Sequence, residues 1–159
     1  EVTVTPEEGE FVDRMGLFME LLGASRTMGR LYGWLMICDP PQQSLTALAK
    51  SLAVSKASVS TVARQLQEGG LIERLPSATR QHVYRVRPGG FTSVMDAQLS
   101  RMKLGIDAAE FGLSLVGDDR AEQRERLEDF RDFCEFSTQA YHDELIRLWT
   151  DYRHSRRQS

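Results

Sequence analysis

Residues 44–87 read SLTALAKSLAVSKASVSTVARQLQEGGLIERLPSATRQHVYRVR. Ser44 and Ser55 are predicted N-caps, because each stands before an apolar run with helical spacing and a serine hydroxyl accepts hydrogen bonds from the free N–H groups of a helix start. Residues 53–54 form the turn between the two helices. Residues 71–75 read as a strand and residues 81–87 as its partner. The pattern therefore predicts helix, turn, helix, strand, loop and strand.

The second helix of this stretch has two unlike faces. Its inner face carries the apolar residues Val59, Val62, Ala63 and Leu66. Its outer face carries Lys56, Ala57, Ser60, Thr61 and Arg64, with Ser58 near the boundary. A helix that enters a DNA major groove must be slim and hydrogen-bonding outside and firmly packed inside. We therefore predict a winged helix-turn-helix, with residues 76–80 as the wing, in a mainly α fold with a small β-wing.

The charge of the stretch differs from that of the chain. Residues 44–87 hold seven basic and two acidic residues, a net charge of +5, whereas the whole chain has a net charge of −3. A basic module inside an acidic protein favours a polyanionic partner, here double-stranded DNA. The predicted contacts are Ser44, Ser55, Lys56, Ala57, Ser58, Ser60, Thr61 and Arg64. For any one of them alone, an ordinary solvated side chain is an equally good interpretation.

Helical patterns flank this module on both sides. An apolar stripe runs from Phe11 to Leu22, a heptad seam from Met95 to Val116, and a further stripe from Leu127 to Tyr152. These patterns predict three regions, namely N-terminal helices at 1–38, the DNA-binding module at 39–90 and C-terminal helices at 91–159. Their apolar surface exceeds what one small winged helix can cover, so we predict a homodimer and hence a near-palindromic operator.

Other classes of protein are disfavoured by the composition. No apolar run among the 159 residues approaches the roughly 18 needed to span a membrane, and no signal peptide is visible, so we expect a cytoplasmic protein. The two cysteines, Cys38 and Cys134, lie far apart and are predicted to be buried thiols, although a redox-sensing role for Cys38 is the alternative. The three histidines have no ligand spacing, and no catalytic set or phosphate loop stands out. We therefore predict no metal, no cofactor and no enzyme activity.

The order of elements resembles the MarR family of bacterial transcriptional regulators. Five strings resemble its GbsR-like branch: FVDRMG at 11–16, MGRLYGWL at 28–35, ICDPPQQS at 37–44, ASVST at 57–61 and GLIER at 70–74. The resemblance implies a homodimeric repressor or activator, of which we expect a repressor, with the terminal helices forming the dimer. It also implies that Arg80, at the wing tip, reaches the minor groove. Ala78 stands where the Asp-x-Arg pattern of the family has its acid.

Five aromatic residues form a candidate effector pocket, namely Tyr32, Trp34, Tyr141, Trp149 and Tyr152. Aromatic cages hold quaternary ammonium groups, and the GbsR-like resemblance implies a choline-like small-molecule effector. The alternative is that these rings belong to the dimer core. Two other functions stay open, a winged-helix protein-interaction module without an operator of its own, and a ligand or redox sensor with vestigial DNA binding.

Overall fold

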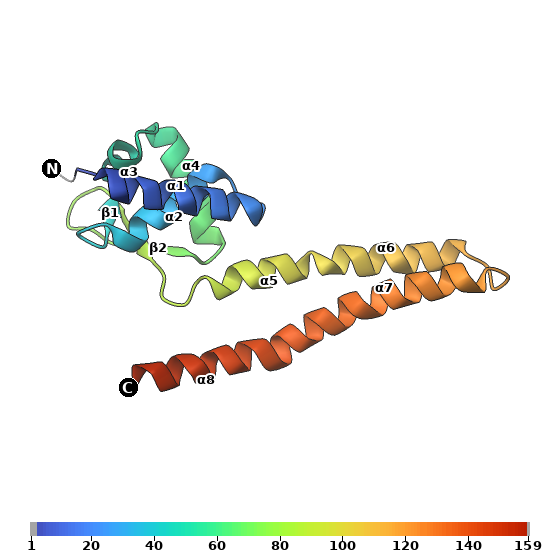
Figure 1. Ribbon diagram of the computed structural model, residues 1–159. Helices are drawn as coiled ribbons and strands as arrows, with labels where there is room; N and C mark the ends of the chain where they lie inside the picture. The colour runs from blue at the N-terminus through green and yellow to red at the C-terminus, as the bar shows by residue number, and fades with distance from the viewer. Residues whose placement is uncertain (1–2, 159) are drawn as a thin grey trace. The chain divides into compact units, whose positions relative to one another are not determined.

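A computed structural model describes residues 3–158 of the chain (Figure 1). The described residues divide into two compact units, which meet in sequence at Val94 and Met95. The elements of the first unit are α1 (Pro6–Leu21), α2 (Arg26–Ile37), β1 (Gln43–Ser44), α3 (Leu45–Leu52), α4 (Lys56–Glu68), β2 (Ile72–Leu75) and β3 (Val83–Val86). Those that follow are α5 (Thr92–Ser100), α6 (Met102–Leu115), α7 (Ala121–Ala140), a π-helical turn (Tyr141–Leu145) and α8 (Ile146–Arg157). The predicted mainly helical fold with a small β-wing is confirmed. The predicted boundaries after residues 38 and 90 stay predictions.

The helix-turn-helix is built by the predicted caps. Ser44 Oγ accepts a hydrogen bond from the Ala47 N–H at 3.1 Å, and Ser55 Oγ accepts one from the Ser58 N–H at 3.1 Å. Between the two helices Ala53 adopts a left-handed conformation, with φ 54°, which ends α3 and turns the chain. Both predicted N-caps are therefore confirmed, and the turn lies where the sequence predicts it.

The sheet is antiparallel and has one more strand than the sequence predicts. Its order is β1-β3-β2, and β1 pairs with β3 through Gln43 opposite Tyr84 and Ser44 opposite Val83. A strand of two residues is too short for an alternating pattern to reveal it. The two predicted strands are also longer than the observed ones, because the ladder covers only Ile72–Leu75 and Val83–Val86.

The core of the first unit lies around α2. Leu31, Trp34 and Leu35 are at most 3% exposed and pack with residues of α1, α3, α4 and the sheet. The contact of α2 with α1 is very close, because a Cβ on Gly29 would lie 2.4 Å from the Met15 carbonyl oxygen. Glycine is therefore required at this position if the two helices are to keep their distance.

The second unit consists of long helices. α6 and α7 run antiparallel and pack against each other (Figure 1), with Ala109 and Cys134 each 2% exposed between them. The Arg124 guanidinium of α7 donates through Nη1 to the carbonyls of Leu113, at 3.2 Å, and Val116, at 2.7 Å. Arg124 thus caps the C-terminal end of α6, whose last carbonyls lack partners within the helix. Among the described residues, no helix combines the length and apolar character needed to cross a membrane.

Both helical patterns of the C-terminal region contain a local irregularity. The heptad seam after residue 91 is divided at Arg101, which separates α5 from α6. The stripe from Leu127 to Tyr152 contains the π-helical turn. A π turn adds a residue and shifts the phase of the side chains. Spacings of three and four residues do not reveal either feature.

Candidate nucleic-acid interface

The two faces of α4 agree with the sequence analysis. Val59, Ala63 and Leu66 are 0% exposed, which fixes the inner face of α4 in the core. The outer-face candidates are all exposed, namely Ser55, Lys56, Ala57, Ser58, Ser60, Thr61 and Arg64. Ser44 differs from them, because it is half-buried at the start of α3. The structure therefore brings seven of the predicted contacts to one exposed surface, which we call the α4 face.

Hydroxyl groups of the α4 face are partly engaged within the helix. Ser55 Oγ donates to Ser58 Oγ at 3.0 Å, and Thr61 Oγ1 donates to the Ala57 carbonyl at 3.1 Å. These contacts hold the side chains in place and leave oxygen lone pairs to accept further hydrogen bonds. Lys56 and Arg64 form no ion pair with any described residue. The two cations of the α4 face are therefore uncompensated.

The wing tip is braced by hydroxyls rather than by an acid. Ser77 Oγ lies 3.0 Å from Thr79 Oγ1 and accepts from the Thr79 N–H at 3.2 Å. The Gln81 N–H in turn donates to Thr79 Oγ1 at 3.4 Å. Arg80 lies within this turn, is exposed, and has no ion pair among the described residues. Ser77 and Thr79 thus brace the loop where the resemblance would have placed an acid at position 78. The sequence analysis missed both, although hydroxyls two residues apart are a known turn signal.

One cation of the sheet is neutralised. Arg85 Nε donates to Glu73 Oε1 at 2.5 Å across the register pair of β2 and β3. Arg74 lies in β2, and Arg87 follows the last residue of β3. Both are exposed, and neither has an ion pair within residues 3–158. The sequence analysis counted both arginines in the basic module but did not propose them as contacts. Together with Arg80, they are exposed arginines of the predicted basic module that have no ion pair among the described residues.

The two cysteines are buried, as predicted. Cys38 is 7% exposed, and its thiol lies 3.8 Å from the Leu35 carbonyl oxygen. Burial raises the pKa of the Cys38 thiol, which disfavours the reactive thiolate. Cys134 is 2% exposed. Within residues 3–158, no three His, Cys, Asp or Glu side chains gather as a metal site would require.

The aromatic candidates for an effector pocket belong to both units. Tyr32, Trp34 and Tyr141 are 2%, 1% and 6% exposed, whereas Trp149 is 43% exposed. The Trp34 indole N–H is buried without a hydrogen-bond partner among the described residues. A groove of about 290 Å³ between the end of α2 and β3 is lined by none of these rings. Three of the five rings are thus buried within the single chain, whereas Trp149 and Tyr152, the latter 53% exposed, are not. Burial within one chain does not test the dimer-core alternative, and an effector pocket built from these rings stays a prediction.

Comparisons with known proteins agree with this geometry. Residues 36–79 match the model of the MarR family, and residues 89–153 match that of the MmpR5-like MarR family transcriptional regulators. The HTH-type transcriptional regulator MmpR5 of Mycobacterium tuberculosis (strain ATCC 25618 / H37Rv) is 38% identical over 143 residues, which cover 89% of this chain and 87% of that protein. A crystal structure of a transcriptional regulator superposes with a TM-score of 0.73 at 37% identity, over 91% of this chain and 99% of that chain.

A more distant match is MepR, a transcription regulator of the Staphylococcus aureus multidrug efflux pump MepA, with a TM-score of 0.43, 21% identity, and coverage of 76% of this chain and 84% of that chain. The narrower placement in a GbsR-like branch stays a prediction. Transcriptional regulators are not enzymes, in agreement with the sequence analysis. The extent of the match to MmpR5 and the winged helix-turn-helix together show that this chain belongs to the MarR family of transcriptional regulators.

Proposed function

We propose that this chain is a homodimeric repressor that binds a specific sequence in double-stranded DNA through the α4 face. The observation that carries the proposal is the α4 face itself, a row of small polar and basic side chains on a helix whose opposite face is buried. Such a helix can approach base edges closely without exposing its apolar side. Arg74, Arg80 and Arg87, which are exposed and have no ion pair among the described residues, add positive charge of the kind that phosphate contacts require.

The side chains of the α4 face suit different parts of a duplex. Lys56 is the first residue of α4, where a cation and free backbone N–H groups together suit a phosphate. Arg64 lies further along the same face and can donate both arms of its guanidinium to a guanine. Ser60 and Thr61 offer hydroxyls for base edges, and Ala57 offers a methyl group that suits a thymine methyl. Ser44, Ser55 and Ser58 are proposed as phosphate contacts at the helix starts.

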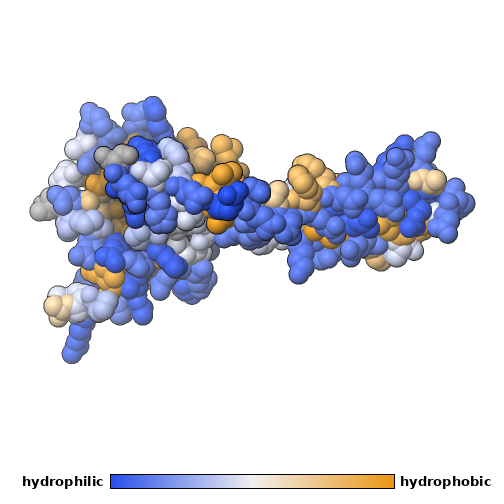
Figure 2. Space-filling view, turned by 90° about the horizontal axis from the view of Figure 1, so that it is seen from below, coloured by the Kyte–Doolittle hydropathy of each residue, from blue (hydrophilic) through white to orange (hydrophobic). Residues whose placement is uncertain are grey.

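The dimer is supported by apolar surface on both units. Large apolar side chains are exposed in the single chain, for example Leu21 at 86%, Phe111 at 66% and Phe136 at 69%. Figure 2 shows apolar groups on the surface of both units as orange areas. Exposed large apolar side chains in this number favour an interface with another chain. A twofold dimer would place two recognition helices about 34–36 Å apart and so require a near-palindromic operator.

The finer expectations complete the proposal. We place the protein in the cytoplasm and in the GbsR-like branch, with a small-molecule effector that changes the spacing of the two recognition helices. An effector of this kind must bind the two spacings with different affinity. The competing function is a winged-helix module that binds a protein and has no operator. The uncompensated cations of the α4 face and the wing favour DNA over that alternative, and the raised pKa of Cys38 disfavours a redox sensor.

The test begins with selection of genomic fragments by the purified chain, followed by sequencing. The enriched duplex and a shuffled duplex of equal composition are then titrated at several salt concentrations. We expect selective binding of the enriched duplex, and affinity for both duplexes that falls as salt rises. Failure to enrich any sequence, together with binding that ignores salt, would favour the protein-interaction module.

A further inference from the structure

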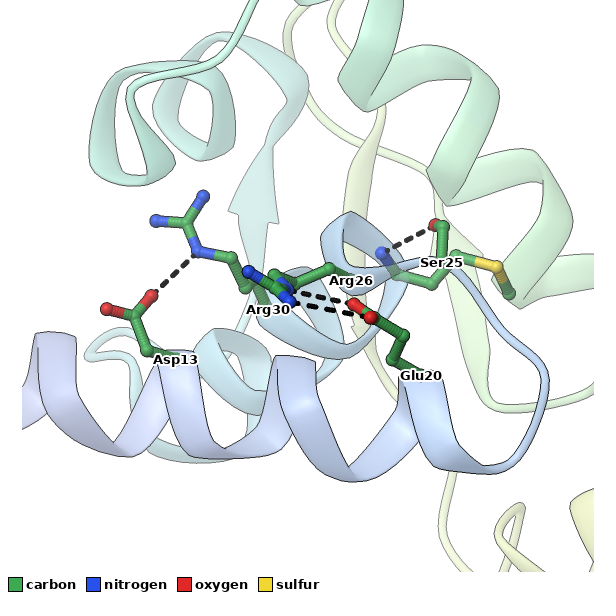
Figure 3. Close-up of polar contacts among 6 residues, drawn as sticks. Asp13, Glu20, Ser25, Arg26 and Arg30 are labelled. Carbon is green, nitrogen blue, oxygen red and sulfur yellow. Dashed lines mark hydrogen bonds and ion pairs between the residues drawn. The ribbon is translucent and has the colours of Figure 1, made fainter.

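Arg30 of α2 joins three helices of the first unit. Its Nε donates to Asp13 Oδ1 of α1 at 3.0 Å, as Figure 3 shows. Its Nη1 donates to the carbonyl oxygen of Leu52 at 3.3 Å, and Leu52 is the last residue of α3. The Arg30 side chain is 27% exposed, so these contacts are partly shielded from water. One guanidinium therefore links α1 and α2 to the turn that precedes α4.

The stem of Arg30 is guided to this position by a glycine. A Cβ on Gly16 of α1 would lie 2.9 Å from Cγ of Arg30 and 2.9 Å from Cγ of Arg26. A larger residue at position 16 would therefore displace both arginine stems. The absence of a side chain at position 16 therefore lets the Arg30 stem lie close against α1.

The carbonyl that Arg30 contacts belongs to a turn that needs support. The last carbonyls of a helix have no partner within the helix and carry its partial negative charge, so a guanidinium suits them. The next residue, Ala53, has φ 54°, a conformation that side chains other than glycine adopt at a cost. The N–H groups of Ala53 and Val54 donate back to Lys50 and Ala49 at 3.3 and 3.1 Å. This turn sets the direction in which α4 leaves α3.

A second arginine pair on the same two helices provides a contrast. Arg26 of α2 donates through Nε to Glu20 of α1 at 2.8 Å and through Nη2 at 3.4 Å (Figure 3). Both side chains are about half exposed, at 57% and 49%. Among the described residues, Arg26 forms no hydrogen bond or ion pair with α3 or the turn. The two pairs thus join α1 to α2 alike, but only Arg30 extends to the turn before α4.

We propose that Arg30 is a positioning residue for DNA binding, which holds the turn at residues 52–54 against α1 and α2 and so fixes the direction of α4. The inference rests on the proposed function of the α4 face. It implies that a movement of the N-terminal helices reaches α4 through Arg30 as well as through the direct packing of α2 on α4. The planar fork of arginine is required, because two N–H groups serve acceptors on two different helices and a lysine ammonium is a single point charge.

The experiment compares Arg30→Gln and Arg30→Lys with Arg26→Gln as the matched control, all in the full chain. Amide hydrogen exchange at Ala53 and Val54 is measured by NMR on the free protein, and operator affinity on the enriched duplex. In both Arg30 variants we expect exchange at these two amides to become at least about tenfold faster, because one hydrogen bond from a charged group is lost. We expect operator affinity to fall by a similar factor. Arg26→Gln should change neither by more than about twofold.

Each result decides the proposal. Unchanged exchange at Ala53 and Val54 in Arg30→Gln would show that Arg30 does not hold the turn. If exchange is faster in Arg30→Gln but its operator affinity equals that of Arg26→Gln, Arg30 supports the fold without positioning α4 for DNA. If Arg30→Lys keeps both the exchange rates and the affinity of the unmutated chain, the guanidinium fork is not required. Hydrogen exchange is measured on the free chain, so it tests the link between Arg30 and the turn without any DNA. If the unmutated chain binds no DNA, that result overturns the proposed function and leaves the exchange test valid. Should Arg30→Gln fail to fold, Arg30→Lys keeps the charge and supplies the same comparison.

Discussion

Arg85 of β3 and Glu73 of β2 face each other across the two strands, with Arg85 Nε 2.5 Å from Glu73 Oε1. Glu73 is the only acid in β2 and β3. The pair is half-exposed, so it contributes little to the stability of the fold. Its main consequence is electrostatic, because it neutralises one of the seven basic residues at positions 44–87.

Replacing Glu73 with Gln should therefore strengthen DNA binding without changing its sequence preference. Arg85 becomes free to contact a phosphate, so the slope of log K against log salt should steepen by about 0.9. Fluorescence anisotropy with the enriched and shuffled duplexes measures both quantities. Glu68→Gln is the matched control, since it removes the same charge at the end of α4, where no ion pair is released among the described residues. Equal gains in the two variants would mean that net charge alone matters.

Arg64→Ala should weaken operator binding and relax the base preference. A bidentate contact of arginine with guanine is worth roughly 1–3 kcal/mol of discrimination. Selection of randomised duplexes by the variant and by the unmutated chain gives the base preference at each position. Gln67→Ala, a similar truncation of an exposed side chain near the end of α4, is the control. A loss of affinity that is uniform for all duplexes would reduce Arg64 to a phosphate contact.

Arg80→Ala should weaken binding to all duplexes and lower the salt dependence. Loss of one phosphate contact reduces the slope of log K against log salt by about 0.9. A loss confined to operators with A·T-rich flanks would instead mean that Arg80 occupies a narrow minor groove. Arg156→Ala removes the same charge from α8 and serves as the control. If affinity and slope are both unchanged in Arg80→Ala, the wing tip lies outside the interface.

Replacing Leu145 and Leu148 together with Asp should abolish the dimer. Both side chains are exposed in the single chain, at 51% and 55%, and buried charge without a partner is strongly unfavourable at an apolar interface. Sedimentation equilibrium should show a dimer for the unmutated chain and a monomeric or unfolded variant with little operator affinity. Thr150→Asp, on the polar side of the same helix, should remain a dimer. A well-folded monomer of the unmutated chain at micromolar concentration would contradict the dimer and the palindromic operator.

The sequence by itself determined the features that depend on near neighbours. The caps at Ser44 and Ser55 are local, because a serine hydroxyl bonds to an N–H group three residues ahead. The two faces of α4 follow from the helical repeat, which separates Val59 and Ala63 from Lys56 and Arg64. The exposed α4 face could therefore be predicted residue by residue.

Only the tertiary structure decided the features that depend on distant partners. The strand β1 has two residues and exists only because β3 lies beside it. Arg30 contacts the Leu52 carbonyl, 22 positions along the chain, and no spacing rule connects the two. The pairing of Arg85 with Glu73 depends on the register of the sheet. Contacts of this kind depend on how whole elements pack, so they leave no short-range pattern in the sequence. Helix caps and helix faces depend only on residues within a few positions of one another.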